Sequence, residues 1–144
     1  MPSDSLSVLV VDEDPGILSF FAKMLDTYGI RALLARDPRE ALGIAKRGYV
    51  PIDVVVTDVN LRTEMAGPEL TSGHNLVDQV RELRPDVRAL YMSACLDAGV
   101  IQIEMVDRGF KTSSTDPDER GLIESIRGAA SAPLAHRAGV SSHH

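Results

Sequence analysis

Two short apolar runs that each end on acidic residues constrain the fold of this chain more than any other feature. Residues 8–11 (VLVV) lead into the acidic residues 12–14, and residues 54–57 (VVVT) lead into Asp58. Short runs rich in β-branched residues are typical of buried parallel strands, whose carboxyl ends form one edge of a sheet. If the two strands are neighbours, these carboxylates converge, and their repulsion favours a bound cation or a proton. The pattern therefore predicts a divalent-metal site centred on an aspartate.

The composition is that of one globular domain. The 144 residues are 44% hydrophobic and 25% charged, which is enough to bury a core without disulfides. The net charge of −6 argues against a nucleic-acid partner. The single cysteine, Cys95, is typical of the reducing cytoplasm. We expect no membrane segment, because no apolar run approaches the roughly 18 residues that a span needs.

Strand-like and helix-like segments alternate along the chain. The expected strands span residues 8–11, 30–35, 52–57, 87–92 and, with a poorer pattern, 109–112. The expected helices span residues 15–28, 38–48, 75–83, 97–106 and 117–128. Asp14, Asp37 and Asp116 each precede a proline, which is the pattern of a helix N-cap followed by its first residue. The alternation predicts an α/β fold over residues 6–128, followed by a disordered tail over residues 129–144.

Three motifs, in matching order and spacing, resemble those of a response-regulator receiver domain. Residues 10–15 (VVDEDP) resemble the acidic pair after the first strand of that family, and residues 55–58 (VVTD) resemble its phospho-acceptor strand. Residues 90–94 (LYMSA) resemble the strand that ends in a hydroxyl residue and a small residue. The resemblance covers residues 6–128 and implies a doubly wound, flavodoxin-like parallel sheet of five strands in the order 2-1-3-4-5.

The resemblance also implies a role for each matching residue. Asp58 would accept a phosphoryl group from a histidine kinase or a phosphotransfer protein, forming an aspartyl phosphate. Asp12, Glu13, Asp58 and the backbone carbonyl of Asn60 would hold Mg²⁺, which prefers oxygen ligands. Glu13 stands where aspartate is commoner in the family, so the position or the affinity of the metal would change.

The switching and cationic parts of the resemblance rest on three further positions. Ser93 would bond a phosphoryl oxygen and move toward it, and Phe110 would be the aromatic residue coupled to that movement. The lysine of the family is expected at position 113, where this chain has Ser113 followed by a second serine. Lys111 faces the same side of a strand as residue 113, so either Lys111 serves the site or the contact is absent.

Two other features concern the surroundings of the site. The loop after Asp58 is longer than is usual in the family, and the insertion around residues 62–72 either covers the site, recognises a partner or has no function. The arginines 81, 84 and 88 are interpreted as the solvent-exposed face of a helix and a turn.

Three functions stay open at this point. The leading hypothesis is a single-domain phospho-acceptor switch, not an enzyme acting on other substrates, which signals by docking to other proteins. The second hypothesis is a pseudo-receiver that acts as an interaction module without phosphorylation. The missing lysine–proline pair favours it, and the set of Asp12, Glu13, Asp58 and Ser93 opposes it. The third is a small Mg²⁺-dependent phosphohydrolase that uses residues 12–14 as a D-x-D motif and leaves Asp58 without a role.

Overall fold

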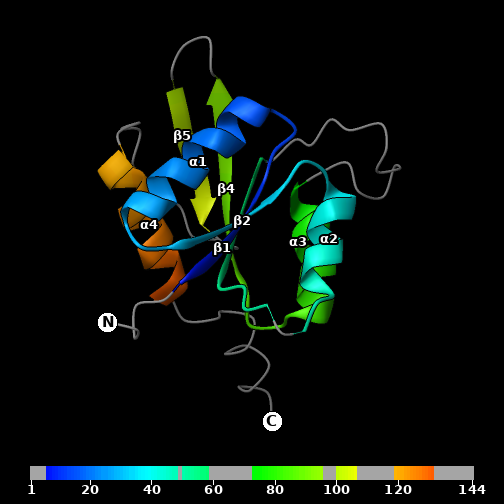
Figure 1. Ribbon diagram of the computed structural model, residues 1–144. Helices are drawn as coiled ribbons and strands as arrows, with labels where there is room; N and C mark the ends of the chain where they lie inside the picture. The colour runs from blue at the N-terminus through cyan, green and yellow to red at the C-terminus, as the bar shows by residue number, and fades with distance from the viewer. Residues whose placement is uncertain (1–5, 49, 59–72, 96–99, 107–118, 132–144) are drawn as a thin grey trace.

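The fold is an α/β sheet with helices on both faces, seen in a computed structural model that describes residues 6–48, 50–58, 73–95, 100–106 and 119–131 (Figure 1). Its strands are β1 (Ser7–Val11), β2 (Arg31–Ala35), β3 (Val54–Asp58), β4 (Arg88–Cys95) and β5 (Val100–Val106). The helices of the described residues are α1 (Pro15–Thr27), α2 (Pro38–Ala45), α3 (Gly73–Leu83) and α4 (Glu119–Ser131).

The strands form one sheet in the order β2-β1-β3-β4-β5, which confirms the predicted order of the first four strands. The first four strands in this order run parallel, and β1 pairs with β2 on one side and with β3 on the other. The residues of β1 are all buried because this central strand is covered on both faces of the sheet. This topology is the reason that the carboxyl ends of β1 and β3 lie side by side.

The fifth strand differs from the prediction in both place and direction. A helix is predicted over residues 97–106, but residues 100–106 form β5, antiparallel to β4, with Cys95 opposite Val100 and Leu90 opposite Val106. The helix prediction is wrong because this segment (VIQIEMV) is rich in β-branched residues and completes the open edge of β4. The register shifts between Tyr91 and Met92, as at a β-bulge. The segment 109–112, predicted as a parallel strand, lies outside the described residues.

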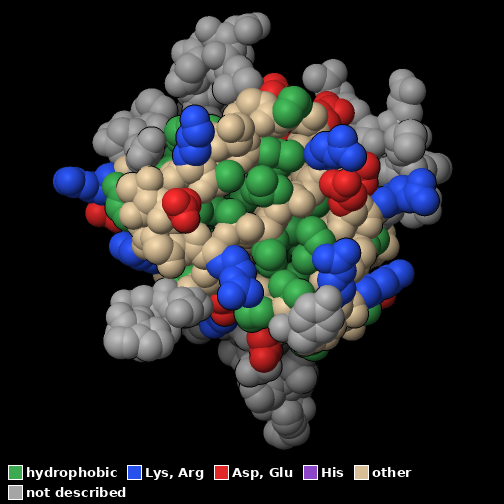
Figure 2. All heavy atoms as spheres, in the orientation of Figure 1, with side chains coloured by type: hydrophobic (Ala, Val, Ile, Leu, Met, Phe, Trp, Pro, Cys, Tyr) green, Lys and Arg blue, Asp and Glu red, His purple; other side chains and the backbone are tan. Residues whose placement is uncertain are grey.

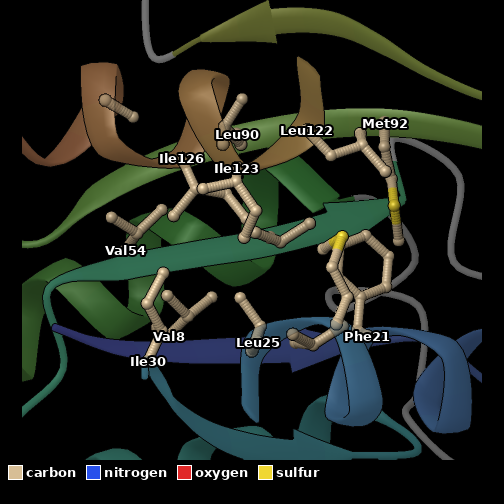
Figure 3. Close-up of a cluster of buried hydrophobic side chains, with 14 of the residues drawn as sticks. Val8, Phe21, Leu25, Ile30, Val54, Leu90, Met92, Leu122, Ile123 and Ile126 are labelled. Atoms are coloured by element: carbon tan, nitrogen blue, oxygen red, sulfur yellow. The ribbon is translucent and has the colours of Figure 1, made fainter. Parts of the chain in front are cut away.

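Two hydrophobic clusters hold the helices against the sheet. The first core cluster lies between the sheet and helices α1 and α4, and its labelled side chains meet in Figure 3. Val8 and Val54 enter this cluster from the sheet, and Phe21 of α1 and Ile126 of α4 meet them there. The second core cluster lies on the opposite face, where α2 and α3 pack (Figure 1). Successive strand residues point alternately into the two clusters, as the pleat of a strand requires.

The starts of α1 and α2 follow the predicted capping pattern, and the third predicted cap, Asp116, lies outside the described residues. Asp14 accepts a hydrogen bond from the backbone N–H of Gly16 at 2.8 Å, and Asp37 accepts one from Glu40 at 2.9 Å, so both caps are confirmed. Helix α2 ends at Ala45, earlier than predicted. Helix α4 continues to Ser131 because Ala129 is buried against the first core cluster, so the predicted tail does not begin at residue 129.

Arg84 fastens the end of α3 to the end of α2. Its Nε donates to the carbonyl oxygen of Ala45 at 3.0 Å, and its Nη2 donates to that of Arg47 at 2.6 Å. Arg81 donates from Nε to the carbonyl oxygen of Val87 at 3.1 Å. The last carbonyls of a helix lack partners within the helix and attract cations. Arg81 and Arg84 are half-buried, so the interpretation of these arginines as a solvent-exposed face holds only in part and leaves out these hydrogen bonds.

The described surface is mixed in character. Figure 2 shows hydrophobic side chains in the middle of one face, with basic and acidic side chains interspersed around them. Leu34 and Leu83 are the large hydrophobic residues most open to solvent in the described ranges, at 38% and 41% exposure. Single exposed leucines of this kind are ordinary on globular proteins. Nowhere in the described ranges does a helix have both the length and the apolar character needed to cross a membrane.

Candidate functional site

The sheet brings Asp12 and Asp58 to the same edge. Val11 of β1 is in register with Thr57 of β3, and these two aspartates are the next residues along the two parallel strands. Asp58 is in turn in register with Met92 of β4, and Ser93 follows Met92 along that strand. Asp12 and Asp58 thus lie where β1 and β3 end, and Ser93 lies beside them in β4, which continues to Cys95. This edge is where α/β sheets of this kind bind ligands.

The Asp12 carboxylate is held in a buried position. The residue is 5% exposed, and its Oδ1 accepts a hydrogen bond from the backbone N–H of Asp14 at 2.8 Å. Its own backbone N–H donates to the carbonyl oxygen of Ala35, at the end of β2, at 3.1 Å. Strand pairing on one side and the turn into α1 on the other thus fix the place of this carboxylate.

Burial raises the pKa of Asp12 to about 6, from an ordinary value of 3.8. The hydrogen bond from Asp14 lowers this pKa, whereas the negative charges of Asp58, Asp14 and Glu13 raise it further. A buried carboxylate close to other carboxylates is stabilised by a proton or by a cation. The residues present therefore fit a hard divalent cation such as Mg²⁺, for which Asp12 and Asp58 would supply oxygen ligands.

The other two acidic residues of the first motif have different surroundings. Asp14 caps α1, as predicted, so its carboxylate is engaged with the helix. Glu13 is exposed. In the part of the chain that the structure describes, no three His, Cys, Asp or Glu side chains are grouped as metal ligands. The structure thus brings Asp12 to Asp58 but does not add Glu13 as a third member of a carboxylate cluster.

One polar residue of the site was missed in the sequence. Thr57 is 0% exposed, and its Oγ1 donates to the backbone carbonyl oxygen of Asp58 at 3.1 Å. The signal was present as the single hydroxyl residue at the end of the apolar run in residues 54–57. This signal is weak in a sequence, because threonine is also an ordinary strand residue.

Several predicted site residues lie outside the described residues. These are Asn60, Phe110, Lys111, Ser113 and the insertion around residues 62–72. For Ser93, the structure gives the position in β4 and the register pairing with Gln102 of β5. The cationic and switching parts of the predicted site thus stay predictions, whereas the structure does place Asp12 and Asp58 at neighbouring strand ends.

Comparisons with known proteins agree with this architecture. The family model of the response regulator receiver domain matches residues 8–112. No curated protein matches the chain. Among solved structures, the receiver domain from the hybrid histidine kinase CckA is 20% identical with a TM-score of 0.62, and covers 86% of this chain and 98% of its own.

Two further solved structures are similar to a comparable degree. A response regulator receiver protein from Sinorhizobium medicae WSM419 is 21% identical with a TM-score of 0.63, over 90% of this chain and 98% of that one. A CheY-like receiver domain protein from Methanospirillum hungatei JF-1 is 20% identical with a TM-score of 0.61, over 88% and 94%. At this identity the structures establish the fold, and the family model covers well over half of the chain. The chain therefore belongs to the response regulator receiver domain family of two-component signalling.

Proposed function

We propose that this receiver domain accepts a phosphoryl group on Asp58 from a histidine kinase or a phosphotransfer protein, with Mg²⁺ held beside it. The observation that carries the proposal is the buried Asp12 carboxylate, whose pKa is raised to about 6 by burial and by neighbouring charges that include Asp58. A carboxylate that attacks a phosphoryl group needs positive charge close to the transferring oxygens. Mg²⁺ supplies that charge when it is bound.

The proposal assigns the metal to oxygen ligands on two strand ends and the loop beyond them. Asp12 and Asp58 are the carboxylate ligands, and the backbone carbonyl of Asn60 is the third ligand from the protein. Glu13 is exposed, and we assign it a contact through a metal-bound water, because Mg²⁺ usually keeps several of its waters. Asp58 then keeps one carboxylate oxygen for the attack on phosphorus.

Ser93 and Lys111 complete the proposed site on the side of the phosphoryl group. Ser93 follows the residue paired with Asp58, which supports a hydrogen bond from its hydroxyl to a phosphoryl oxygen. Lys111 is proposed as the cation that replaces the family lysine expected at Ser113. Movement of Ser93, coupled to Phe110, would change the surface that partner proteins contact.

The proposed output is docking to another protein. The phosphoryl group ends on a side chain of the chain itself, so we assign no separate substrate beyond the phosphoryl donor. Phosphorylation and dephosphorylation of Asp58 are the only reactions that the site would promote. We also propose that the protein works in the cytoplasm, as its single cysteine predicts.

The test is phosphorylation by a small-molecule donor. The protein is incubated with Mg²⁺ and acetyl phosphate, and its intact mass is followed in the wild type, in Asp58→Asn and in Asp26→Asn. Asp26 is an exposed carboxylate of α1 and serves as the matched control. We expect one phosphoryl group on the wild type and on Asp26→Asn, and none on Asp58→Asn. A wild type that stays unmodified at millimolar donor would contradict the proposal.

The same proteins, with an added assay of phosphate-ester hydrolysis, separate the two other functions. The pseudo-receiver is favoured by Ser113 at the position of the family lysine, and it requires an unmodified wild type in the presence of Mg²⁺. A phosphohydrolase would turn over a phosphate ester many times. Its activity would persist in Asp58→Asn and would be lost in Asp12→Asn. Each function therefore gives a different combination of results in the same three proteins and the Asp12 variant.

A further inference from the structure

The hydroxyl of Thr57 is the one polar side-chain group that β3 buries completely, directly before the acceptor. Thr57 is 0% exposed, and its Oγ1 donates to the carbonyl oxygen of Asp58 at 3.1 Å. We propose that Thr57 is a positioning residue for Asp58, which it holds in place through this hydrogen bond. The inference rests on the proposed function, because positioning matters only if Asp58 takes the phosphoryl group.

The neighbours of Thr57 in the sheet are buried in an apolar cluster, so its hydroxyl has few hydrogen-bond partners other than the Asp58 carbonyl. The strand register places Val11 on one side of Thr57 and Tyr91 on the other, and both are buried in the second core cluster. A hydroxyl buried among apolar groups is destabilising unless it is hydrogen-bonded. Within the described residues, no buried side-chain nitrogen or oxygen is left without a hydrogen-bond partner. The bond to the Asp58 carbonyl therefore offsets the burial of this hydroxyl.

Packing alone would be served as well by valine. Valine occupies the three preceding positions of the same strand and has nearly the shape of threonine. What threonine adds at position 57 is the hydroxyl, and the hydroxyl contacts the acceptor residue itself. This hydrogen bond restrains the peptide group that follows the Cα of Asp58, and with it the backbone from which the carboxylate projects.

A restraint of this kind acts on the rate of phosphoryl transfer. In-line attack requires the carboxylate oxygen to lie at a defined distance and angle from phosphorus, and small misplacements slow such reactions strongly. The bond between the phosphoryl group and its donor breaks as the bond to the Asp58 oxygen forms, and the electron pair leaves with the donor. Thr57 takes part in neither bond, so its effect is on geometry and not on the chemistry of the donor.

The experiment compares Thr57→Val with Thr57→Ser under saturating Mg²⁺ and acetyl phosphate. Thr57→Val keeps the shape and removes the hydrogen bond, and we expect it to be phosphorylated about five- to tenfold more slowly. Thr57→Ser keeps the hydroxyl, and we expect it to restore most of the rate. Thr27→Val is the matched control, since Thr27 is exposed and donates to the carbonyl oxygen of Lys23 at 2.9 Å. This control should be phosphorylated at the wild-type rate.

A second readout separates positioning from packing. Thermal unfolding of each variant reports stability, and the carbonyl ¹³C resonance of Asp58 reports the hydrogen bond directly. We expect this resonance to move in Thr57→Val and to stay near its wild-type position in Thr57→Ser. A Thr57→Val variant with the wild-type rate overturns the inference, as does an equal loss of rate and stability in both Thr57 variants.

Phosphorylation of the wild type and of Thr57→Val distinguishes a failure of this inference from a failure of the proposed function. If the wild type takes no phosphoryl group, the proposed function is wrong and the role of Thr57 is wrong with it. If the wild type is phosphorylated and Thr57→Val matches it, the acceptor stands and only the positioning role is lost.

Discussion

Asp12 and Asp58 lie at adjacent strand ends, one residue beyond the register pair formed by Val11 and Thr57, so that two carboxylates meet where β1 and β3 end. Asp12 is 5% exposed, and burial is the largest cause of its raised pKa. The site is therefore destabilised by its own charge until a proton or a cation binds there. We therefore expect both the stability of the fold and the proposed binding of Mg²⁺ to depend on pH.

We expect Asp12 to destabilise the metal-free fold as the pH rises from about 4 to above 6. Its pKa is about 6 in the folded state and 3.8 without the fold, so the folded state binds more protons in this window. The free energy of unfolding then falls with rising pH, and the total loss is up to about 3 kcal/mol. Urea denaturation at a series of pH values, in the presence of a chelator, measures this fall in the free energy of unfolding for the wild type and for Asp12→Asn.

The Asp12→Asn variant keeps an oxygen for the N–H of Asp14 but carries no charge. We expect it to be more stable than the wild type near neutral pH, and we expect the difference to shrink below pH 5. A stability difference that does not change with pH would show that Asp12 does not titrate as proposed.

Mg²⁺ affinity should follow the ionisation of Asp12. Because the metal binds the deprotonated carboxylate, affinity should fall by up to about tenfold for each pH unit below pH 6. The shift in melting temperature caused by Mg²⁺ measures this, since a ligand that binds only the folded state stabilises it. Asp26→Asn should behave as the wild type, and Asp12→Asn should lose most of the shift. Equal Mg²⁺ affinity at pH 5 and pH 7 would contradict a role for Asp12 as a ligand.

Removal of the Arg84 guanidinium should loosen the contact between α2 and α3. Arg84→Met leaves the carbonyl oxygens of Ala45 and Arg47 without this donor, and we expect a loss of about 1.5–3 kcal/mol in the free energy of unfolding. Chemical denaturation checks the loss, with Arg39→Met as the control on the exposed surface of α2. Faster amide exchange at the end of α2 should accompany the change. A loss equal to that of the control would mean that the two hydrogen bonds contribute nothing measurable.

Phe21 and Phe20 should differ strongly in their contribution to stability. Phe21 is 0% exposed in the first core cluster, whereas Phe20 is partly buried and meets Phe21 edge to face at 5.5 Å between ring centroids. We expect Phe21→Ala to cost about 3–5 kcal/mol and Phe20→Ala clearly less. Equilibrium denaturation compares the two variants directly, and equal losses would contradict the burial of Phe21.

Residues 100–106 should give the NMR signature of a strand. We expect extended backbone chemical shifts over this range and close contacts across β4 and β5, such as that between Ala94 and Ile101. Helical shifts over residues 97–106 would restore the helix that the sequence predicts and would remove β5 from the sheet.

The sequence by itself determined the local elements and the acidic motif. The strand positions of β1 to β4 follow from short apolar runs, and the starts of α1 and α2 follow from Asp14 and Asp37, because a cap is satisfied within a few residues. The order of the strands came from the resemblance to the receiver family, and the sheet confirms it for β1 to β4. The acidic strand ends could be named from the sequence for the same local reason.

Only the tertiary structure decided features that depend on distant residues. Residues 100–106 are rich in β-branched residues, but they form a strand in this sheet because the edge of β4 is available for pairing, which depends on the tertiary structure. Arg84 is half-buried and donates to carbonyls 37 and 39 residues away in sequence. The pKa of Asp12 rose because packing buries it close to Asp58. Capping and strand propensity act over a few residues, whereas burial, strand pairing and electrostatic interactions depend on which segments the fold brings together.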